Sequence, residues 1–294
     1  METLVINKTN YKKLKKLELN KDICNTECKL FILDNKVVKK LLKIFFINEG
    51  VYFGNKLLTI NSLIDAKDEI NIKELILPEK LVVVGDKVAG FSMPYINNYN
   101  LQLILSSKDV PISQKIIFLK EIGKIIEKIQ YIKPYNKAFY LSDIHESNFI
   151  YDLEKKIVCA VDLDGCKITN NEPSPIKFLS TNKNVSKYPY KYPQKENNVY
   201  IPNSNTEYFC YMMMILNTIS YNQINHLSES DFYLYLQYLK DLGFSHEFLS
   251  QFYTIYTNSN NKFEIDTLNE IPSNNNIAKA HYKVFKYNYK KYFN

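Results

Sequence analysis

The sequence contains no arginine and no tryptophan, so all 38 basic residues are lysines. Lysine is a mobile point charge and lacks the planar fork with which arginine reads bases and phosphates. The formal net charge of +7 therefore does not by itself indicate a nucleic-acid-binding protein. We interpret the lysine clusters at residues 12–16 and 283–291 as solvated surface, and we do not expect nucleic acid as a partner.

Glycine and cysteine are also scarce. None of the seven glycines lies between Met1 and Glu49, which excludes a glycine-rich phosphate loop in that part of the chain. Five cysteines in 294 residues do not make a disulfide framework. Cys24 and Cys28 have C-x3-C spacing, but no second pair lies at zinc spacing, so we interpret the cysteines as reduced, structural residues.

Long apolar runs are absent too. No run approaches the roughly eighteen residues of a membrane span, and the N-terminus lacks a signal-peptide core. We therefore expect a cytoplasmic protein without a membrane span. With 294 residues, of which 46% are hydrophobic, the chain can form one large domain or two lobes with separate cores.

The most informative stretch is AFYLSDIHESNFIYDLEKKIVCAVDLDG, residues 138–165. Asp143 stands five residues before Asn148 in a polar loop, and Asp162 and Asp164 end an apolar, strand-like run. The first pair alone is also typical of ordinary turns. Apolar strands seldom end in paired acids without a ligand, however, and carboxylate and amide oxygens are suited to holding Mg²⁺ against phosphates.

This stretch resembles the catalytic loop and metal-binding loop of the protein-kinase-like superfamily, where the pattern is Asp, four residues, Asn, a hairpin and then Asp-Phe-Gly. Leu141 replaces the usual His two residues before Asp143. His145 stands two residues after Asp143, where protein kinases usually carry Lys and aminoglycoside-type phosphotransferases often carry His. The motif is thus intermediate between protein kinases and small-molecule kinases.

The resemblance implies a phosphotransferase that uses ATP and Mg²⁺ and acts on a hydroxyl. In that reading Asp143 orients the acceptor hydroxyl, and Asn148 and Asp162 ligate Mg²⁺. Asp164 assists a second ion, and His145 neutralises charge on the γ-phosphate as it moves.

The resemblance also implies an α+β, bilobal protein-kinase-like fold. The expected N-lobe is small, β-rich and spans residues 1–95; the C-lobe is larger, mostly helical and spans 96–294. Residues 29–45 predict a hairpin around Asp34-Asn35, whose second strand would supply a lysine to the α and β phosphates. We expect Lys39 in this role and Lys40 as the second choice, because a register slip of one residue exchanges the faces of a strand.

Two further segments complete the expected N-lobe. Residues 52–65 have a helical apolar face, but no Glu stands where the resemblance requires a partner for the lysine. Residues 77–96 predict a second hairpin that resembles the strands leading into the interlobe hinge. The carbonyl of Pro94 and the amide of Ile96 would then pair with the adenine edge, since proline lacks an N–H but keeps its carbonyl.

The expected C-lobe contains two well-marked helices. One is amphipathic, spans residues 116–129 and is predicted to be capped by Ser113. The other, residues 207–219, is apolar all round, which a soluble protein tolerates only in a helix buried on every side. The resemblance implies that Glu207, at its start, anchors the backbone of the catalytic loop.

The remaining chain predicts loops and helices. Residues 166–206 match the activation segment in position, and without arginine they cannot be ordered through a bidentate arginine–phosphate clamp. Further helices are expected near residues 229–242, 245–257 and 276–291, with Gly243 as a stop and Ser245 as a cap.

Three functions remain open at this stage. A Ser/Thr protein kinase is favoured by Glu207 and by the long segment before it. A small-molecule kinase, of the aminoglycoside or choline type, is favoured by His145 and by the absent glycine-rich loop. A pseudokinase that acts as a binding module is favoured by that absent loop and by the absent helix Glu.

Overall fold

The computed structural model describes residues 3–18, 27–34, 39–173, 195–196, 199–200, 202–220, 229–256, 262–272 and 274–288. Within them the chain is α+β and forms two compact units. The first comprises Met1–Tyr99, Ile132–Phe139 and Ile150–Glu172, and the second Asn100–Tyr131, Tyr140–Phe149 and Pro173–Asn294. Cys24, the turn residue Asn35 and most of the predicted activation-like segment lie outside the described residues.

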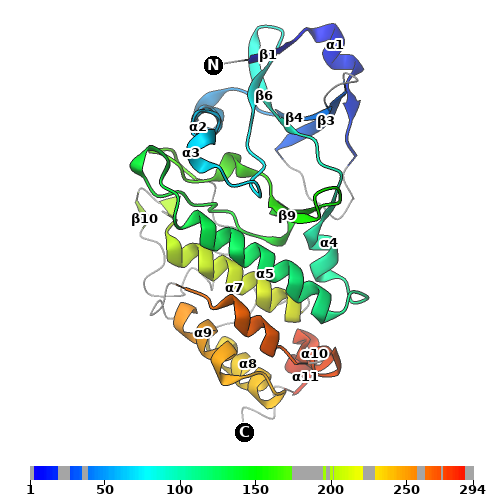
Figure 1. Ribbon diagram of the computed structural model, residues 1–294, viewed down its shortest axis with the longest axis vertical. Helices are drawn as coiled ribbons and strands as arrows, with labels where there is room; N and C mark the ends of the chain where they lie inside the picture. Colours follow the sequence, from blue (N-terminus) through cyan, green and yellow to red (C-terminus); the bar gives the residue numbers. More distant parts are fainter. Residues whose placement is uncertain are drawn as a thin grey trace. The chain divides into compact units, whose positions relative to one another are not determined.

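A six-stranded sheet forms the first unit's framework (Figure 1). Its order is β1-β5-β6-β4-β3-β2, and every neighbouring pair is antiparallel except β1 with β5. The strands are β1 Thr3–Ile6, β2 Lys15–Lys16, β3 Cys28–Asp34, β4 Lys39–Phe45, β5 Lys80–Val84 and β6 Lys87–Pro94. Both predicted hairpins, β3–β4 and β5–β6, are confirmed. Strands β1 and β2 were not predicted, because runs of two to four residues carry too little alternation to be recognised.

Both faces of this sheet are covered, because alternate residues of a strand point to opposite sides. On one face Leu42 packs in an apolar cluster with Phe31, and Tyr11 of α1 (Lys8–Lys13) meets the Phe31 ring edge-on at 5.3 Å between centroids. On the other face Phe45 packs against Phe53 of α2 (Gly50–Asp65). Helix α2 is the helix predicted at residues 52–65, and α3 (Lys67–Ile70) follows it.

A smaller sheet of order β7-β8-β9 brings a later part of the chain into the first unit. Its strands are β7 Asn98–Asn100, β8 Phe149–Asp152 and β9 Ile157–Ala160. The Ala160 amide donates to the Glu74 carbonyl at 2.8 Å, and the Ile76 amide donates to the Ala160 carbonyl at 3.0 Å. These bonds tie β9, and the acids that follow it, to the first unit. The first unit therefore does not end at a single boundary near residue 95. It also includes two later segments, Ile132–Phe139 and Ile150–Glu172.

The second unit is mostly helical. Its elements are α4 Leu101–Ser106, α5 Ile112–Ile129, the 3-10 turn η2 Glu146–Asn148, strands β10 Lys195–Glu196 and β11 Val199–Tyr200, α7 Ser204–Ser220, α8 Glu229–Asp241, α9 His246–Tyr256, η6 Ile265–Glu270, α10 Asn274–Ala280 and α11 Tyr282–Asn288. Helix α7 lies beside α5 (Figure 1) and is buried from Thr206 to Ser220, which confirms the prediction of a helix enclosed on every side. No helix in the described part of the chain is both long and apolar enough to cross a membrane.

The start of α5 differs from the prediction. Its N-cap is Pro111, whose carbonyl accepts from the amides of Gln114 at 3.1 Å and Lys115 at 3.2 Å. Ser113 lies inside the first turn and is not the cap. The cap at Ser245 is confirmed, since its hydroxyl oxygen accepts from the Phe248 amide at 3.1 Å.

The last predicted helix is divided in two at His281. The hydroxyl of Tyr235 donates to the Ala280 carbonyl, and that of Tyr238 donates to the Lys279 carbonyl, both at 2.8 Å. These carbonyls then bond to side chains of α8, and a new helix begins, with the Lys283 amide donating to Nδ1 of His281 at 3.1 Å. The division thus has a tertiary cause that periodicity does not reveal.

Close packing at Gly123 gives a first testable prediction. A Cβ atom on Gly123 would lie 2.6 Å from the Tyr211 hydroxyl oxygen and 2.9 Å from Ile265. We therefore expect Gly123→Ala to lower the free energy of unfolding by about 1–3 kcal/mol, as overpacking does, measured by denaturant titration. Gly54→Ala is the matched control, because a Cβ there meets nothing within 4 Å and should stabilise α2 by up to about 1 kcal/mol. An unchanged Gly123→Ala variant would contradict the close contact of α5 with α7 and η6.

Candidate functional site

A first group of candidate residues, in the first unit, surrounds Lys43 in the middle of β4. Lys43 is buried, with 5% exposure, on the sheet face that also carries Phe45 and the cross-strand neighbour Phe91. Its ammonium nitrogen lies 5.4 Å from the Phe45 ring centroid and 5.9 Å from that of Phe91. An ammonium group in such apolar surroundings requires a counter-charge.

The counter-charges come from the loop after β9. The Lys43 Nζ forms an ion pair with Oδ1 of Asp162 and donates to Oδ1 of Asp164 at 2.6 Å. Asp162 adopts the left-handed conformation, φ 64° and ψ 41°, at the entrance to the 3-10 turn η3 (Leu163–Gly165). This sparsely populated conformation, held by the surrounding contacts, brings both acids to the same lysine.

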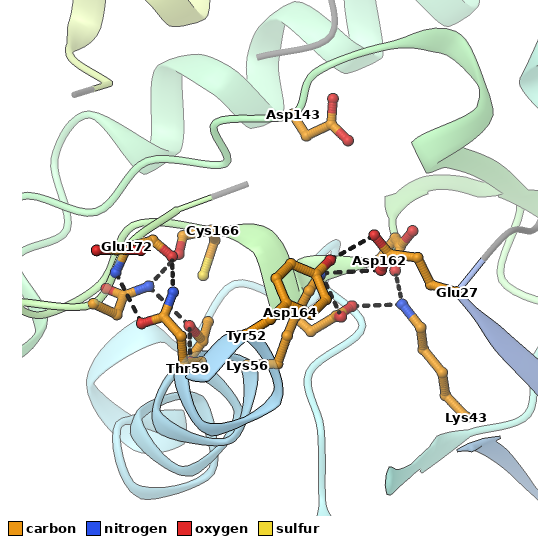
Figure 2. A network of polar contacts seen from close by, with 12 residues as sticks. Glu27, Lys43, Tyr52, Lys56, Thr59, Asp143, Asp162, Asp164, Cys166 and Glu172 are labelled. Atoms are coloured by element: carbon orange, nitrogen blue, oxygen red, sulfur yellow. Dashed lines mark hydrogen bonds and ion pairs between the residues drawn. The ribbon is translucent and has the colours of Figure 1, made fainter. Parts of the chain in front are cut away.

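A second buried lysine completes this cluster (Figure 2). Lys56 of α2 lies with its Nζ 3.0 Å from Oδ2 of Asp164 and 3.3 Å from Glu27. The Tyr52 hydroxyl donates to Glu27 at 2.6 Å. The side chain of Asp164 has no exposed surface, so each of its two oxygens faces one lysine.

The charges of this cluster depend on one another. Burial by itself would lower the pKa of Lys43, but the charges of Asp162 and Asp164 raise it well above its usual value. Burial would raise the pKa of Asp164, yet Lys43 and Lys56 hold it well below its usual value. Burial and the neighbouring charge of Asp164 raise the pKa of Asp162, an effect that water moderates because the Asp162 side chain is 47% exposed. Of the two acids, Asp164 is therefore the one whose charged form the two lysines favour more strongly.

Lys39, the residue expected to bind phosphate, lies on the same strand as Lys43. Lys39, Leu41 and Lys43 share one face of β4, but Lys39 is exposed at the start of the strand, with its Nζ 3.8 Å from the Tyr95 ring centroid. Four residues of strand place it about 13 Å along from Lys43. Lys40 points to the other face and pairs with Glu79. The buried, acid-paired lysine on this face of β4 is thus Lys43 and not Lys39.

A second group of candidate residues lies in the loop of the second unit that carries Asp143. The carboxylate of Glu207 accepts from the amides of Leu141 at 3.0 Å and Ser142 at 2.9 Å. The Asp143 amide donates back to the Leu141 carbonyl at 2.8 Å, which makes a tight turn around Ser142, whose φ is 68°. The prediction that Glu207 anchors this backbone is confirmed.

Three predicted residues lie together in this loop. The Asn148 Nδ2 donates to the Asp143 carbonyl at 2.8 Å, which leaves its Oδ1 as the oxygen that a cation could use. The Nε2 of His145 lies 3.4 Å from Oδ2 of Asp143, and its Nδ1 is 2.6 Å from the Ser147 hydroxyl oxygen. His145 is 7% exposed, so its neighbours within the loop orient it, and it in turn limits the orientations of Asp143.

Asp143 has an unsatisfied oxygen. Its Oδ1 is buried and has no hydrogen-bond partner among the residues that the structure describes. A buried carboxylate oxygen without a donor is costly, and a substrate hydroxyl is one group that would satisfy it. The arrangement is suited to accepting a proton from such a hydroxyl.

The two residues expected to contact adenine lie at the end of β6. Pro94 is the last residue of that strand and pairs in register with Lys40. Ile96 follows, partly buried against the apolar cluster that contains Phe45. Its carbonyl accepts from the Asn98 side chain at 2.8 Å.

The oxygen ligands expected for Mg²⁺ belong to both units. Asp162 and Asp164 lie in the first and Asn148 in the second. No group of three or more His, Cys, Asp or Glu side chains gathers as a metal cluster in the described ranges. Mg²⁺ keeps several waters and needs only one or two protein carboxylates. The half-exposed carboxylate of Asp162 fits such an ion, whereas the fully enclosed Asp164 does not.

The sequence contains a signal for Lys43 that was not used. LLKIF, residues 41–45, is an apolar run interrupted by one lysine, and a lysine inside a buried strand must have an acid beside it. Lys56 has no comparable signal, because a single lysine on a helix is normally solvated.

The chain was also compared with known proteins. No protein-family model matches it, and a search of curated proteins finds no significant match.

Glu207 gives a second testable prediction, of pH dependence. Burial raises its pKa from the ordinary value of 4.5 to about 7, against the two backbone amides that lower it. The protonated form of Glu207 is thus favoured in the folded state. Its contribution to the free energy of unfolding is complete below pH 4.5 and is lost as the pH rises through 7. Relative to Glu207→Gln, the wild type should lose about 3 kcal/mol of unfolding free energy between pH 4.5 and 7.5.

Urea denaturation at several pH values measures this difference. Glu247→Gln, at an exposed position in α9, is the control and should differ from the wild type by the same amount at every pH. A wild-type advantage over Glu207→Gln that grows with pH would show that the backbone amides outweigh burial.

Proposed function

We propose that this chain is an ATP- and Mg²⁺-dependent phosphotransferase with a bilobal, protein-kinase-like fold, acting on a hydroxyl. The observation that carries the proposal is the partly buried ion pair of Lys43 with Asp162, formed between a buried strand lysine and an acid two residues after β9. Lysine binds phosphate as a point charge. When Asp162 serves a bound cation, Lys43 loses one counter-ion and its ammonium group is available to phosphate oxygens.

Each residue then has a defined role. Lys43 holds the non-transferred phosphates, replacing Lys39 in that role. Asp162 would hold Mg²⁺, with Asn148 as the further oxygen ligand that the resemblance implies, and the ion when bound would neutralise charge on the phosphates. Asp143 receives the proton of the acceptor hydroxyl, and His145 orients Asp143.

The transfer step follows from these roles. The acceptor oxygen attacks the γ-phosphorus as the bond from that phosphorus to the β-phosphate bridging oxygen breaks. The hydroxyl proton passes to a carboxylate oxygen of Asp143, and ADP leaves with the bonding electron pair. Such catalysis depends mainly on positioning and electrostatics, which is consistent with the anchoring of the Asp143 loop by Glu207.

The favoured acceptor is a Ser or Thr hydroxyl of a protein. The buried helix that begins with Glu207 supports this class, because it resembles the corresponding helix of protein kinases. The direct contact between His145 and Asp143 favours the second candidate, a small-molecule alcohol or aminoglycoside kinase. Incubation with a generic protein substrate and, separately, with an aminoglycoside distinguishes these two.

The proposal gives a third testable prediction at Asp143. We expect Asp143→Asn to lower transfer from radiolabelled ATP by about 10²- to 10⁴-fold, the usual contribution of a general base. Nucleotide affinity should be retained, because Asp143 takes no part in the lysine cluster. An Asp143→Asn variant with full activity would exclude Asp143 as the base. A wild type that binds ATP with Mg²⁺ but transfers no phosphate to any acceptor would indicate a pseudokinase instead.

A fourth prediction compares two lysines on the same face of β4. We expect Lys43→Met to abolish measurable binding of ATP with Mg²⁺, in a fluorescent-nucleotide titration. Lys39→Met is the matched control and should bind as the wild type does, because Lys39 lies at the exposed start of the strand. Since Lys43→Met leaves two acids without their lysine, folding is checked by circular dichroism, and Lys43→Arg, which keeps the charge, is measured in parallel. If Lys43→Met and Lys39→Met lost ATP binding equally, the proposal that Lys43 is the phosphate-binding lysine would be wrong.

A further inference from the structure

One face of helix α2 contacts the loop at residues 162–172 through polar groups. Tyr52, Asn55, Lys56 and Thr59 follow one another at helical spacing, so they lie on the same side of the helix. The expected carboxylate partner for the strand lysine is absent from this face, and a lysine, Lys56, stands there instead (Figure 2).

The charges at this contact alternate. Asp164 lies between the two lysines, with Oδ1 2.6 Å from the Lys43 Nζ and Oδ2 3.0 Å from the Lys56 Nζ. Lys56 is 7% exposed and Asp164 is 1% exposed, so neither charge is compensated by bulk water. In the buried series Lys43–Asp164–Lys56, Lys43 comes from strand β4, Asp164 from the loop and Lys56 from helix α2.

Neutral hydrogen bonds hold the same loop. The Asn171 side chain donates to the Thr59 hydroxyl at 2.8 Å and to the Cys166 carbonyl at 2.7 Å. Asn55 donates to the Glu172 carbonyl at 2.6 Å and accepts from the Glu172 amide at 3.1 Å. These bonds fix the part of the loop that follows Asp164 against helix α2.

We propose that Asp164 is not a metal ligand but the internal counter-ion that joins Lys43 to Lys56, and that Lys56 is a positioning residue for the phosphate-binding lysine. This inference rests on the proposed function and deepens it, because it leaves Asp162 as the one carboxylate of this loop that serves Mg²⁺. The charges of the helix–strand contact are thereby exchanged. The acid that neutralises Lys43 comes from the loop and not from helix α2, and the helix contributes a lysine instead.

The test compares ATP binding in Mg²⁺ and in EDTA. Because Asp164 acts through Lys43, we expect Asp164→Asn to weaken binding by the same factor in both solutions, and Lys56→Met to do likewise. Asp162→Asn should weaken binding by about 10- to 100-fold in Mg²⁺ but should not weaken it in EDTA, because without the cation Asp162 only competes with phosphate for Lys43. If Asp164→Asn weakens binding only in Mg²⁺, Asp164 is a metal ligand and the proposal is overturned.

Thermal unfolding provides an independent readout that needs no nucleotide. Breaking a buried ion pair from one side should lower the unfolding midpoint by about 6–10 °C. The double variant Lys56→Met/Asp164→Asn should lose clearly less than the sum of the two single losses, because its second change removes a charge that has already lost its partner. Additive losses would contradict the role of Lys56 as the partner of Asp164.

Two controls complete the design. Lys87→Met breaks the exposed pair of Lys87 with Glu49 and should change neither binding nor the midpoint. Asn55→Ala removes neutral bonds from the same helix face and should leave the Lys56–Asp164 non-additivity intact. If the wild type binds no ATP in either solution, the proposed function fails, whereas the unfolding data still decide whether Asp164 and Lys56 form the buried pair.

Discussion

The architecture of the candidate site depends on the burial of one ammonium group. Lys43 lies in the middle of an apolar strand, where an uncompensated charge would be prohibitive, so the fold must bring acids to it. The loop after β9 does so with Asp162 and Asp164. From this requirement follow the left-handed conformation of Asp162, the docking of helix α2 through Lys56 and the place of β9 in the first unit.

The second unit also contains a buried ionisable group that requires partners, but its partners are of a different kind. The carboxylate of Glu207 is fully buried, and its partners are two backbone amides rather than a cation. Each unit thus fixes a loop to a buried ionisable side chain, and each loop contains a non-glycine residue with positive φ, Ser142 in one and Asp162 in the other. Strained residues of this kind persist only where surrounding contacts hold them, and they are frequent at active sites.

The acids that pair with Lys43 come from the loop after β9 and not from helix α2. Where a strand lysine depends on a helix acid, movement of the helix breaks the pair. Here the lysine's acids belong to the loop itself, and the helix contributes Lys56 together with the neutral groups Asn55 and Thr59. Among the described residues, the charge of Lys43 is therefore balanced by the acids of this loop and not by an acid of helix α2.

Sequence patterns by themselves determined the elements and the order of the polar residues. Both hairpins of the main sheet, helix α2, the enclosed helix α7 and the anchoring role of Glu207 were predicted, because each depends on local periodicity or on a motif. The position of the lysine along β4, the break at His281 and the pairing of Asp164 with Lys56 were decided only by the tertiary structure. Each of these depends on groups distant in sequence that meet in a buried environment: acids beside a lysine, tyrosine hydroxyls on helix carbonyls, and a helix lysine on a loop carboxylate. A buried charged or polar group requires a partner, but only the tertiary structure determines which residue that partner is.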